Sequence, residues 1–193
     1  RLWFDRYRPA RHQARGFHIR RMRTLRDIRE MNRIFKSRGM VSIDPEFLRG
    51  VRRSRNMTFF VAAPEDESTI LGAVIGVDHK EAFGDPENGS SLWCLAVDPQ
   101  AELPGIGQTL VRHLAEHYQA RGRSFMDLSV MHDNAEAIGL YEKLGFERVP
   151  VFCIKKKNPI NEPLFIGGES DENLNPYARI IVNEARRRGI AVE

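Results

Sequence analysis

The sequence predicts an α/β (α+β) domain with a mixed, mostly antiparallel sheet and helices on both faces. Three observations support this fold class. Apolar runs of strand length alternate with helical periodicities along the chain. A short polar link at 64–69, PEDEST, joins two of the strands and predicts an antiparallel hairpin. Hydrophobic residues make up 41% and charged residues 29% of the 193 residues, which is typical of a globular protein.

The first half of the chain predicts three strands and two helices. Thr24 is a candidate N-cap with an acid, Asp27, three residues on, and it predicts the start of a helix. Asp44 before Pro45 predicts a second helix start. The apolar face of the first helix comprises Leu25, Ile28, Met31, Ile34 and Phe35, and the strands are expected at 17–23, 57–63 and 70–79.

In the second half, a loop at 81–90 precedes further strands and helices. Strands are expected at 91–97, 124–131 and 146–156, and helices at 105–120 and 134–144, the last of them ending at Gly145. A helix and an unfinished strand after 174 suggest that the chain is a fragment of a longer protein. The expected organisation is an N-terminal arm at 1–16, a domain at 17–157, a polar linker at 158–174 and the start of a truncated second domain at 175–193.

The composition of the chain indicates which binding partners and which cellular location to expect. Residues 1–55 hold 17 Lys and Arg against 5 Asp and Glu, but no aromatic platform accompanies them, so nucleic acid is not an expected partner. We expect this charge to form a solvated face or to meet an acidic neighbour. No apolar stretch approaches the roughly 18 residues of a membrane span, so no membrane association is expected. Cys94 and Cys153 lie in apolar runs, which favours buried thiols and a cytoplasmic location.

Two glycines, Gly105 and Gly107, stand between a predicted strand and a predicted helix. A nucleotide-binding P-loop would need a lysine after these glycines, but Gln108 stands there. A dinucleotide-binding fingerprint would need a third glycine, but Leu110 stands at that position. What remains is a helix N-terminus whose free backbone N–H groups bind a pyrophosphate. The simpler alternative is a glycine turn that only starts a helix.

A second motif, NAEAIGLYEKLGF at 134–146, follows the next predicted strand. Together with Val97-Asp98-Pro99 and Pro104-Gly105-Ile106-Gly107, it resembles the GNAT family of acyl-CoA-dependent N-acetyltransferases, over about residues 17–156. The resemblance implies a sheet with a central splay between two parallel strands. It also implies acetyl-CoA as cosubstrate, with no metal.

The resemblance implies a role for each matching residue. Backbone groups of Leu95 and Val97 would bond the pantetheine arm like an added strand, and Tyr141 would be the general acid. Asn134 would contact the pantetheine or thiol end. The turn at 102–107, with the N–H groups of Gln108 and Thr109, would hold the pyrophosphate. The implied cofactor-binding set is Leu95, Ala96, Val97, Glu102, Leu103, Pro104, Gly105, Ile106, Gly107, Gln108, Thr109, Asn134, Ala137 and Tyr141.

Some positions depart from the family pattern or compete with it. Glu102 stands where the family has Gln or Arg, so we expect its carboxylate to point outward, with Arg112 compensating. The segment HLAEH at 113–117 matches a zinc-peptidase pattern, but no third ligand follows, and no metal is expected. The strand at 91–97 holds no carboxylate or histidine. The base therefore stays open among His79, Glu81, Asp98, His132, Asp133 and a water wire.

Two features of the sequence indicate which amine accepts the acetyl group: the lack of a strong base and the last twenty residues. A weak base favours an α-amine, because its pKa of about 8 leaves roughly a tenth of it neutral at pH 7. Residues 174–193 resemble the opening of an ATP-grasp ligase, and the chain, including 26–45, resembles the N-acetylglutaminylglutamine synthetases, which make an acetylated, amidated dipeptide osmolyte. The resemblance implies glutamine or a glutamine dipeptide as the acceptor and a ligase domain in cis. Three alternatives stay open. The acceptor can be another amine, the domain can be a non-catalytic one that senses acyl-CoA or docks a ligase, and the chain can form a homodimer.

Overall fold

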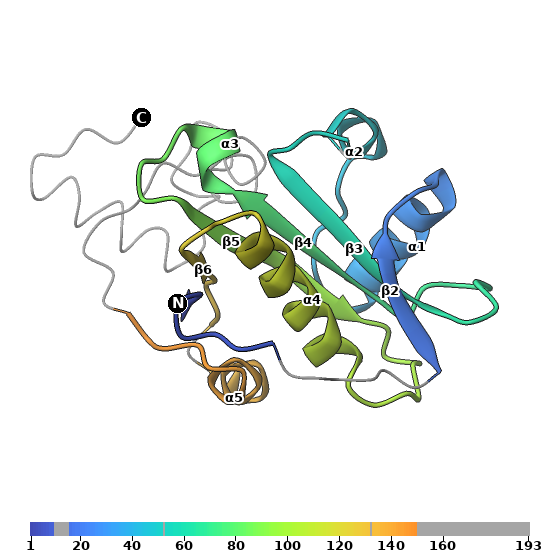
Figure 1. Ribbon diagram of the computed structural model, residues 1–193. Coiled ribbons are helices and arrows are strands. Elements are labelled where there is room, and N and C mark those ends of the chain that lie inside the picture. Colours follow the sequence, from blue (N-terminus) through green and yellow to red (C-terminus); the bar gives the residue numbers. More distant parts are fainter. Residues whose placement is uncertain (10–15, 52, 132, 150–193) are drawn as a thin grey trace, which may run out of the picture. The chain divides into compact units, whose positions relative to one another are not determined.

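The computed structural model describes residues 1–9, 16–51, 53–131 and 133–149. Within them six strands form one sheet in the order β1-β6-β5-β4-β3-β2 (Figure 1). All neighbours are antiparallel except β5 and β6, which run parallel, so the predicted mixed sheet is confirmed. The strands are β1 Leu2–Trp3, β2 Phe17–Arg21, β3 Met57–Pro64, β4 Gly72–Asp78, β5 Gly89–Val97 and β6 Phe125–Asp127.

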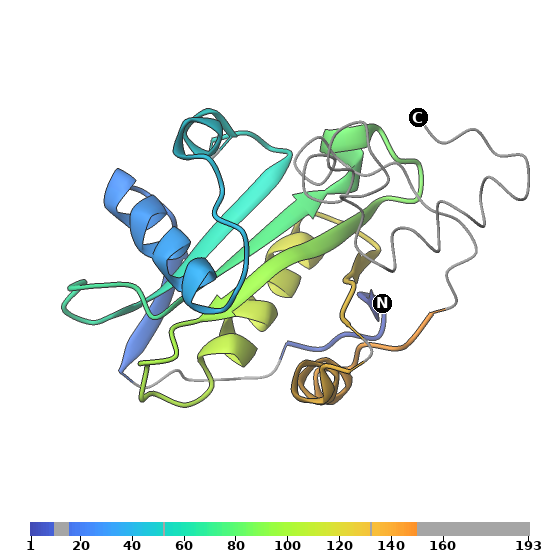
Figure 2. The same ribbon diagram turned by 180° about the vertical axis from the view of Figure 1, so that it is seen from behind.

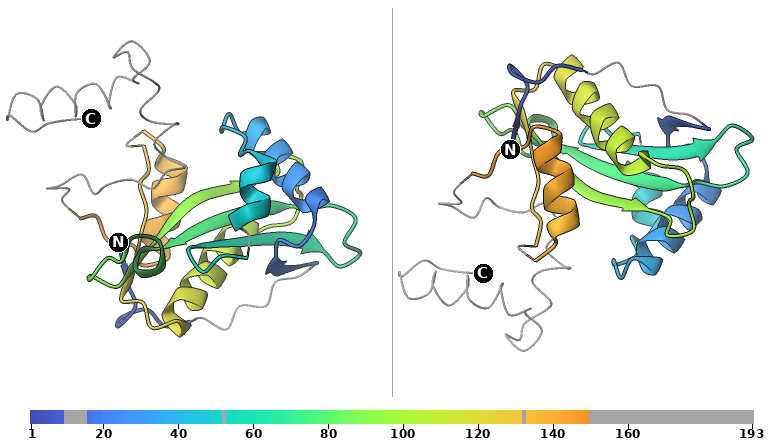
Figure 3. Two further views of the ribbon diagram at one scale, coloured as in Figure 1. Left: turned by 90° about the horizontal axis from the view of Figure 1, so that it is seen from above. Right: turned by 90° about the horizontal axis from the view of Figure 1, so that it is seen from below.

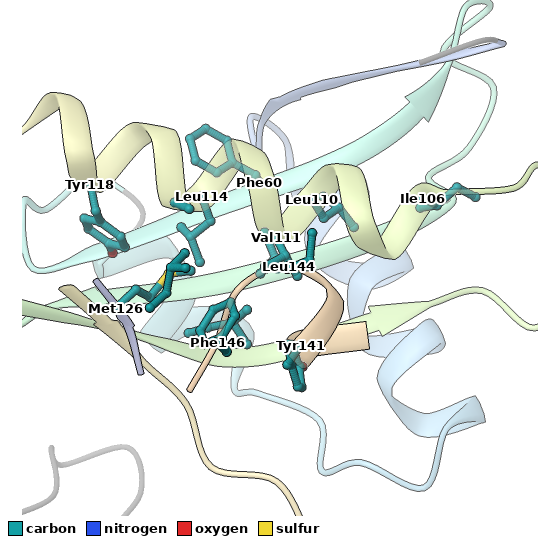
Figure 4. Packing of buried hydrophobic residues seen from close by; sticks show 14 of the residues in the cluster. Phe60, Ile106, Leu110, Val111, Leu114, Tyr118, Met126, Tyr141, Leu144 and Phe146 are labelled. Atoms are coloured by element: carbon teal, nitrogen blue, oxygen red, sulfur yellow. The ribbon is translucent and has the colours of Figure 1, made fainter. Parts of the chain in front are cut away.

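Helices cover both faces of the sheet, as predicted. Helices α1, Leu25–Ser37, and α2, Pro45–Val51, lie over one face, which is turned toward the viewer in Figure 2. Helix α4, Ile106–Ala120, lies on the opposite face (Figure 3). Helix α5, Ala135–Lys143, adds Tyr141 to the hydrophobic core beneath α4, and Leu144, which follows the helix, packs there as well (Figure 4).

Helix α1 begins at the predicted cap. Thr24 Oγ1 accepts from the Asp27 N–H at 3.1 Å, and the Asp27 carboxylate accepts in return from the Thr24 N–H. The two terminal guanidinium nitrogens of Arg20 also donate to Asp27, at 2.9 and 3.0 Å. Four of the five predicted core residues of α1 are buried, but Leu25 is 41% exposed. Side chains of a helix lean toward its N-terminus, so that of the first residue extends past the helix end.

Two glycines of β4 let α4 approach the sheet closely. A Cβ on Gly76 would lie 2.7 Å from atoms of Leu114 and Tyr118, and a Cβ on Gly72 would lie 3.1 Å from Ile106. All three helix side chains are almost completely buried. Close packing along β4 therefore sets the position of α4, and with it the position of the glycine turn that precedes α4.

The expected strand 124–131 is much shorter in the structure. Strand β6 ends at Asp127, and residues 128–131 leave the sheet. Of the expected strand 146–156, residues 146–149 are not in a strand, and the rest lies outside the described residues. The edge position beside β6 belongs instead to β1, which lies in the segment expected to be an arm; the Glu147 N–H donates to the Arg1 carbonyl at 2.9 Å. A two-residue strand has no periodicity by which the sequence could reveal it.

The expected loop 81–90 begins with a short helix, α3, His79–Phe83. Asp78 caps it by accepting from the Glu81 N–H, and Gly84 ends it in the left-handed region at φ 63°. Asp78 is fully buried and also accepts from Arg123 Nε, with 2.9 Å to each carboxylate oxygen. This pair joins the end of β4 to the turn before β6. The predicted linker 158–174 and second domain 175–193 lie outside the described residues.

Replacing Gly76 by alanine should destabilise the fold, because the new methyl group overlaps the buried side chains of Leu114 and Tyr118. Overpacking of this kind costs about 1–3 kcal/mol in the free energy of unfolding. Gly139 in α5 is the matched control, since a Cβ there meets no atom within 4 Å. Gly139→Ala should stabilise by about 0.5–1 kcal/mol through helix propensity. Urea unfolding measures both, and equal midpoints for Gly76→Ala and wild type would contradict the close approach.

Candidate active site

The two parallel strands in the middle of the sheet pair only at their beginning. Gly89, Ser90 and Ser91 of β5 lie opposite Phe125, Met126 and Asp127 of β6. Strand β5 then continues to Val97 without β6 beside it. The ladder between β5 and β4 shifts at Trp93, because Cys94 lies opposite Ile75 whereas Leu92 lies opposite Gly76. A bulge of this kind bends and twists a strand, and it lies where β5 and β6 part.

The register shows which backbone groups of β5 face this gap. The Asp98 N–H donates to the Leu71 carbonyl at 2.8 Å, so these two residues form a hydrogen-bonded pair. In the same register, Ala96 lies opposite Ala73, two residues further along each strand. Bonded and non-bonded pairs alternate along antiparallel strands. The N–H and C=O groups of Leu95 and Val97 therefore point away from β4, toward the gap. Arg38, just after α1, donates from Nε to the Val97 carbonyl at 2.8 Å.

The glycine turn leads from β5 to an uncapped helix. Gly105 occupies the left-handed region at φ 79° and is the N-cap of α4, with no side-chain capping bond. The N–H and hydroxyl of Thr109 both donate to the Gly105 carbonyl, at 2.9 and 2.7 Å. The first helical bond thus belongs to Thr109, so the donors left at this helix end are those of Ile106, Gly107 and Gln108. Such a cluster, together with the helix dipole, suits an anion.

The rest of the turn is shaped by Asp98. Its carboxylate accepts from the Gln100 N–H at 2.9 Å and from Arg33 at 2.7 Å. Burial alone would raise the pKa of Asp98, but these two hydrogen bonds outweigh it and hold the pKa below the usual range. Asp98 is therefore a turn residue that stays ionised. Glu102 and Pro104 are exposed, as expected for Glu102, and Leu103 is half-buried. Arg112 lies elsewhere, in a pocket with residues of the N-terminal segment.

Tyr141 belongs to the core between α4 and α5 (Figure 4). Its ring meets Phe146 edge-on at 5.5 Å and is 9% exposed. Burial raises the pKa of the Tyr141 phenol, so the hydroxyl stays protonated in the neutral range. Leu95, Val97 and Ala137, from the predicted cofactor set, pack against the same core. The structure therefore brings the β5 edge, the start of α4 and Tyr141 around one cluster.

Asn134 has a structural task that the sequence interpretation did not assign to it. It is the N-cap of α5, and its Oδ1 accepts from the Ala137 N–H at 3.1 Å. The side-chain amide group of Asn134 can still donate to a ligand. Ala96, also in the predicted set, is 5% exposed and pairs with Ala73. Its backbone N–H and C=O groups face β4, so a ligand beside β5 meets its neighbours instead.

The base candidates are widely separated. His79 at the start of α3 is 7% exposed, and its Nε2 lies 2.5 Å from Ser91 Oγ. Glu81 lies near Arg121 and Arg123, both at 3.8 Å. Asp133 is exposed, and His132 lies outside the described residues. Only His79, among the candidates that the structure describes, is hydrogen-bonded to a side chain of β5.

The zinc-like segment of α4 does not form a metal site in the described ranges, where no group of three His, Cys, Asp or Glu side chains gathers. His113 and His117 meet the ring of Phe60 edge-on at 4.5 and 5.4 Å. Burial, followed by the charges of Arg21 and Arg121, lowers the pKa of His117 to about 4. Glu116 lies near Arg112 and Tyr7 instead.

A family model described as the acetyltransferase (GNAT) family matches residues 22–146. The chain belongs to this acetyltransferase family. Members of the GNAT family use acetyl-CoA as cosubstrate, and the splay between the two parallel central strands is the arrangement that the resemblance implied. The predicted fold class is therefore confirmed, and the family assignment with it.

Curated relatives within the GNAT family match a part of the chain. The [ribosomal protein bS18]-alanine N-acetyltransferase of Escherichia coli K12 is 39% identical over 62 residues, which are 32% of this chain and 42% of that protein. The enzyme of the same name from Salmonella typhimurium LT2 gives the same shares. The match thus spans less than half the length of these relatives.

Solved structures share the GNAT fold over more of the chain. The aminoglycoside acetyltransferase meta-AAC0020 from an uncultured soil sample aligns with a TM-score of 0.58 and 20% identity, covering 74% of this chain and 97% of that one. AAC(6')-Iy, bound to a bisubstrate analogue built on CoA, aligns with a TM-score of 0.58 and 16% identity, covering 74% and 98%. The S18-alanine enzyme of Escherichia coli has a TM-score of 0.56 at 22% identity, covering 69% and 79%.

Sequence reasoning missed three features of this GNAT domain. Trp93 is the bulge residue, Arg38 reaches the Val97 carbonyl, and Ser91 is the hydrogen-bond partner of His79. A bulge depends on the partner strand, and the two contacts join residues far apart in the chain, so no local pattern could indicate them. None of the helices in the described part has the length and apolar character that crossing a bilayer requires.

The low pKa of His117 makes stability depend on pH. As the pH falls from about 6.5, the ordinary histidine value, toward about 4, the unfolded chain takes up a proton that the folded His117 refuses. The free energy of unfolding should therefore fall across this window. One histidine contributes at most about 3 kcal/mol, and less here because the half-buried ring is screened by solvent.

Urea unfolding of wild type and His117→Gln at several pH values checks this effect. The variant should lose less stability than the wild type between these two pH values. Parallel loss in both proteins would show that His117 is not responsible.

Proposed function

We propose that this chain transfers an acetyl group from acetyl-CoA to the α-amine of glutamine or of a glutamine dipeptide. One observation carries the acetyl-CoA part of the proposal. Among the described residues no strand pairs with the edge of β5 at Leu95 and Val97, and this edge leads directly into a helix end whose N–H groups lack a side-chain cap. A ligand that carries two amide groups followed by a pyrophosphate matches this order of hydrogen-bonding groups and anion site.

In this proposal the pantetheine arm bonds the β5 edge as an added strand. Its amide N–H competes with Arg38 for the Val97 carbonyl, so Arg38 has to move when the arm binds. The pyrophosphate accepts from the N–H groups of Ile106, Gly107 and Gln108, but not from that of Thr109, which the sequence interpretation included, because Thr109 already bonds Gly105. Glu102 is exposed and can stay away from the phosphates. No cationic side chain is needed, since helix N-termini bind such anions through main-chain donors.

Tyr141 supplies the proton for the leaving thiolate. Its ring is held in the hydrophobic core beside Phe146, and this packing fixes where its hydroxyl lies. The raised pKa of the phenol keeps the proton in place until a thiolate develops beside it. The polarised thioester carbonyl is attacked by the neutral amine, the C–S bond breaks, and the sulfur takes the Tyr141 proton.

The acceptor part of the proposal rests on chemistry and on sequence resemblance. Strand β5 offers no carboxylate to deprotonate an amine, which favours an α-amine over a lysine with its pKa of about 10.4. The related S18 enzyme is by name an alanine N-acetyltransferase, so its acceptor also carries an α-amine. Glutamine itself, and a ligase domain in cis, are supported by the resemblance of 26–45 and 174–193 to N-acetylglutaminylglutamine synthetases.

Thiol release from acetyl-CoA tests the proposal against a panel of glutamine, glutaminylglutamine, glutaminylglutaminamide and lysine peptides. We expect turnover with a glutamine compound, and a fall in kcat of about 10²–10³-fold in Tyr141→Phe with little change in the Kd of acetyl-CoA. Tyr118→Phe is the matched control, because this tyrosine is fully buried at the other end of α4.

Each outcome of the panel separates one part of the proposal. Turnover with lysine peptides alone would keep the acetyltransferase and reject the glutamine acceptor. Tight acetyl-CoA binding with no turnover on any amine would instead indicate a sensing or docking domain. Equal losses in Tyr141→Phe and Tyr118→Phe would reject Tyr141 as the acid.

A further inference from the structure

We propose that Ser91 and His79 together accept the proton of the acceptor amine, with Ser91 touching the amine and His79 acting through Ser91. The inference rests on the proposed acetyl transfer and names the base that the sequence leaves open. It is carried by the position of the two side chains at the closed end of the gap between β5 and β6.

Ser91 is the residue at which the gap closes. It is the last residue of β5 that pairs with β6, and Asp127 lies opposite it. A ligand that enters at Val97 and lies along β5 therefore directs its far end toward Trp93 and Ser91. The Ser91 side chain is half-buried and lies on the face of the sheet opposite to Leu92, which packs in the core beneath α4. Ser91 thus combines access to the gap with a hydroxyl group.

His79 is held against Ser91 by its surroundings. Its Nε2 lies 2.5 Å from Ser91 Oγ, and the rings of Phe83 and Phe125 are each 6.1 Å away. A Cβ on Gly89 would lie 2.8 Å from His79 Nδ1 and closer still to Phe125, so a glycine is required beside the imidazole. The fold therefore leaves this space for the histidine.

An acidic neighbour favours the tautomer that a base needs. The Asp85 carboxylate lies 3.8 Å from His79 Nδ1, and the Asp85 N–H donates to the His79 carbonyl. A proton on Nδ1 is stabilised by that carboxylate, which leaves Nε2 as the acceptor for the Ser91 hydroxyl. The same charge stabilises the imidazolium once Nε2 has taken a proton. Asp85, His79 and Ser91 are thus arranged as carboxylate, base and hydroxyl.

Other charged groups near His79 already have partners. Asp78, which precedes His79, accepts from Arg123, and Asp127 on β6 accepts from Arg1 at 2.8 and 3.1 Å. On α3 itself, Glu81 lies 3.8 Å from Arg121, and Lys80 is exposed. Among the described contacts, the Asp85 carboxylate is the acidic group that lies against the imidazole, at 3.8 Å from Nδ1.

The proton transfer balances with the acetyl transfer. The amine nitrogen forms a bond to the thioester carbon and gives a proton to Ser91 Oγ, while the Ser91 hydroxyl proton passes to His79 Nε2. The C–S bond breaks, and the thiolate takes the proton of Tyr141. His79 then returns its proton to solvent, and Tyr141 regains one. Histidine suits this role because its ordinary pKa, about 6.5, lies near neutral pH.

The test compares Ser91→Ala and Ser91→Thr with wild type, using the amine that wild type accepts. The pH range runs from about 5.5 to about 9, around the ordinary pKa of histidine. Ser91→Ala should lower kcat on the order of 10²-fold and remove the rise of kcat with pH, with the Kd of acetyl-CoA unchanged. Ser91→Thr keeps the hydroxyl and should retain most of the activity. His79→Gln should reproduce the altered pH profile.

Two control variants separate this role from a structural one. Ser90→Ala removes the neighbouring hydroxyl, which donates to the Phe125 carbonyl at 2.8 Å, and should keep the wild-type pH profile. Asp127→Asn removes the carboxylate opposite Ser91. If the rise of kcat with pH were lost in Asp127→Asn and kept in Ser91→Ala, the proposal would be overturned. An unchanged profile in Ser91→Ala overturns the relay alone. A wild-type chain that acetylates no amine overturns the proposed function and the relay together.

Discussion

The separation of β5 from β6 is the constraint on which the site depends. The two strands share only three paired positions, and a bulge at Trp93 turns β5 away just beyond them. On the other side of the gap, α5 and the residue that ends it place Tyr141 and Leu144 in the core under α4. Continued pairing would satisfy the backbone of Leu95 and Val97 internally and leave nothing for a ligand to bond. An exposed strand edge in the middle of a sheet is otherwise a liability, and the acyl-CoA that we propose to bind there would pair with the edge that the described strands leave open.

The position of the proposed anion site follows from the packing of α4. A helix N-terminus can bind a phosphate only where its free N–H groups face the place that the ligand reaches. Gly72 and Gly76 of β4 bring α4 close to the sheet, and Gly105 provides the left-handed turn that connects β5 to α4. The β5 edge and the helix end are consequently continuous, which is what an extended ligand with a charged end requires.

The excess of arginine in the first third of the chain has a largely structural use where its partners are described. Arg20 is only 10% exposed and bonds both Asp27 and Glu67, and Arg33 joins α1 to Asp98 in the turn before α4. This agrees with the expectation that the basic charge meets acidic neighbours. Exposed ion pairs contribute little to stability. Their value here is to hold α1 beside the turn that precedes α4.

The sequence by itself determined the elements that carry their own local pattern. Thr24 and Asp27 form the predicted capping box, PEDEST joins an antiparallel pair, and Gly105 and Gly145 adopt positive φ where a helix begins or ends. The family motifs also led from sequence to the edge of β5 and to Tyr141. The tertiary structure alone decided where β6 stops, that β1 takes the sheet edge, that Thr109 is no free donor, and that His79 meets Ser91. Except for the helical bond from Thr109 to Gly105, which follows from where α4 begins, these depend on contacts between residues farther apart in the chain, which local sequence patterns do not encode.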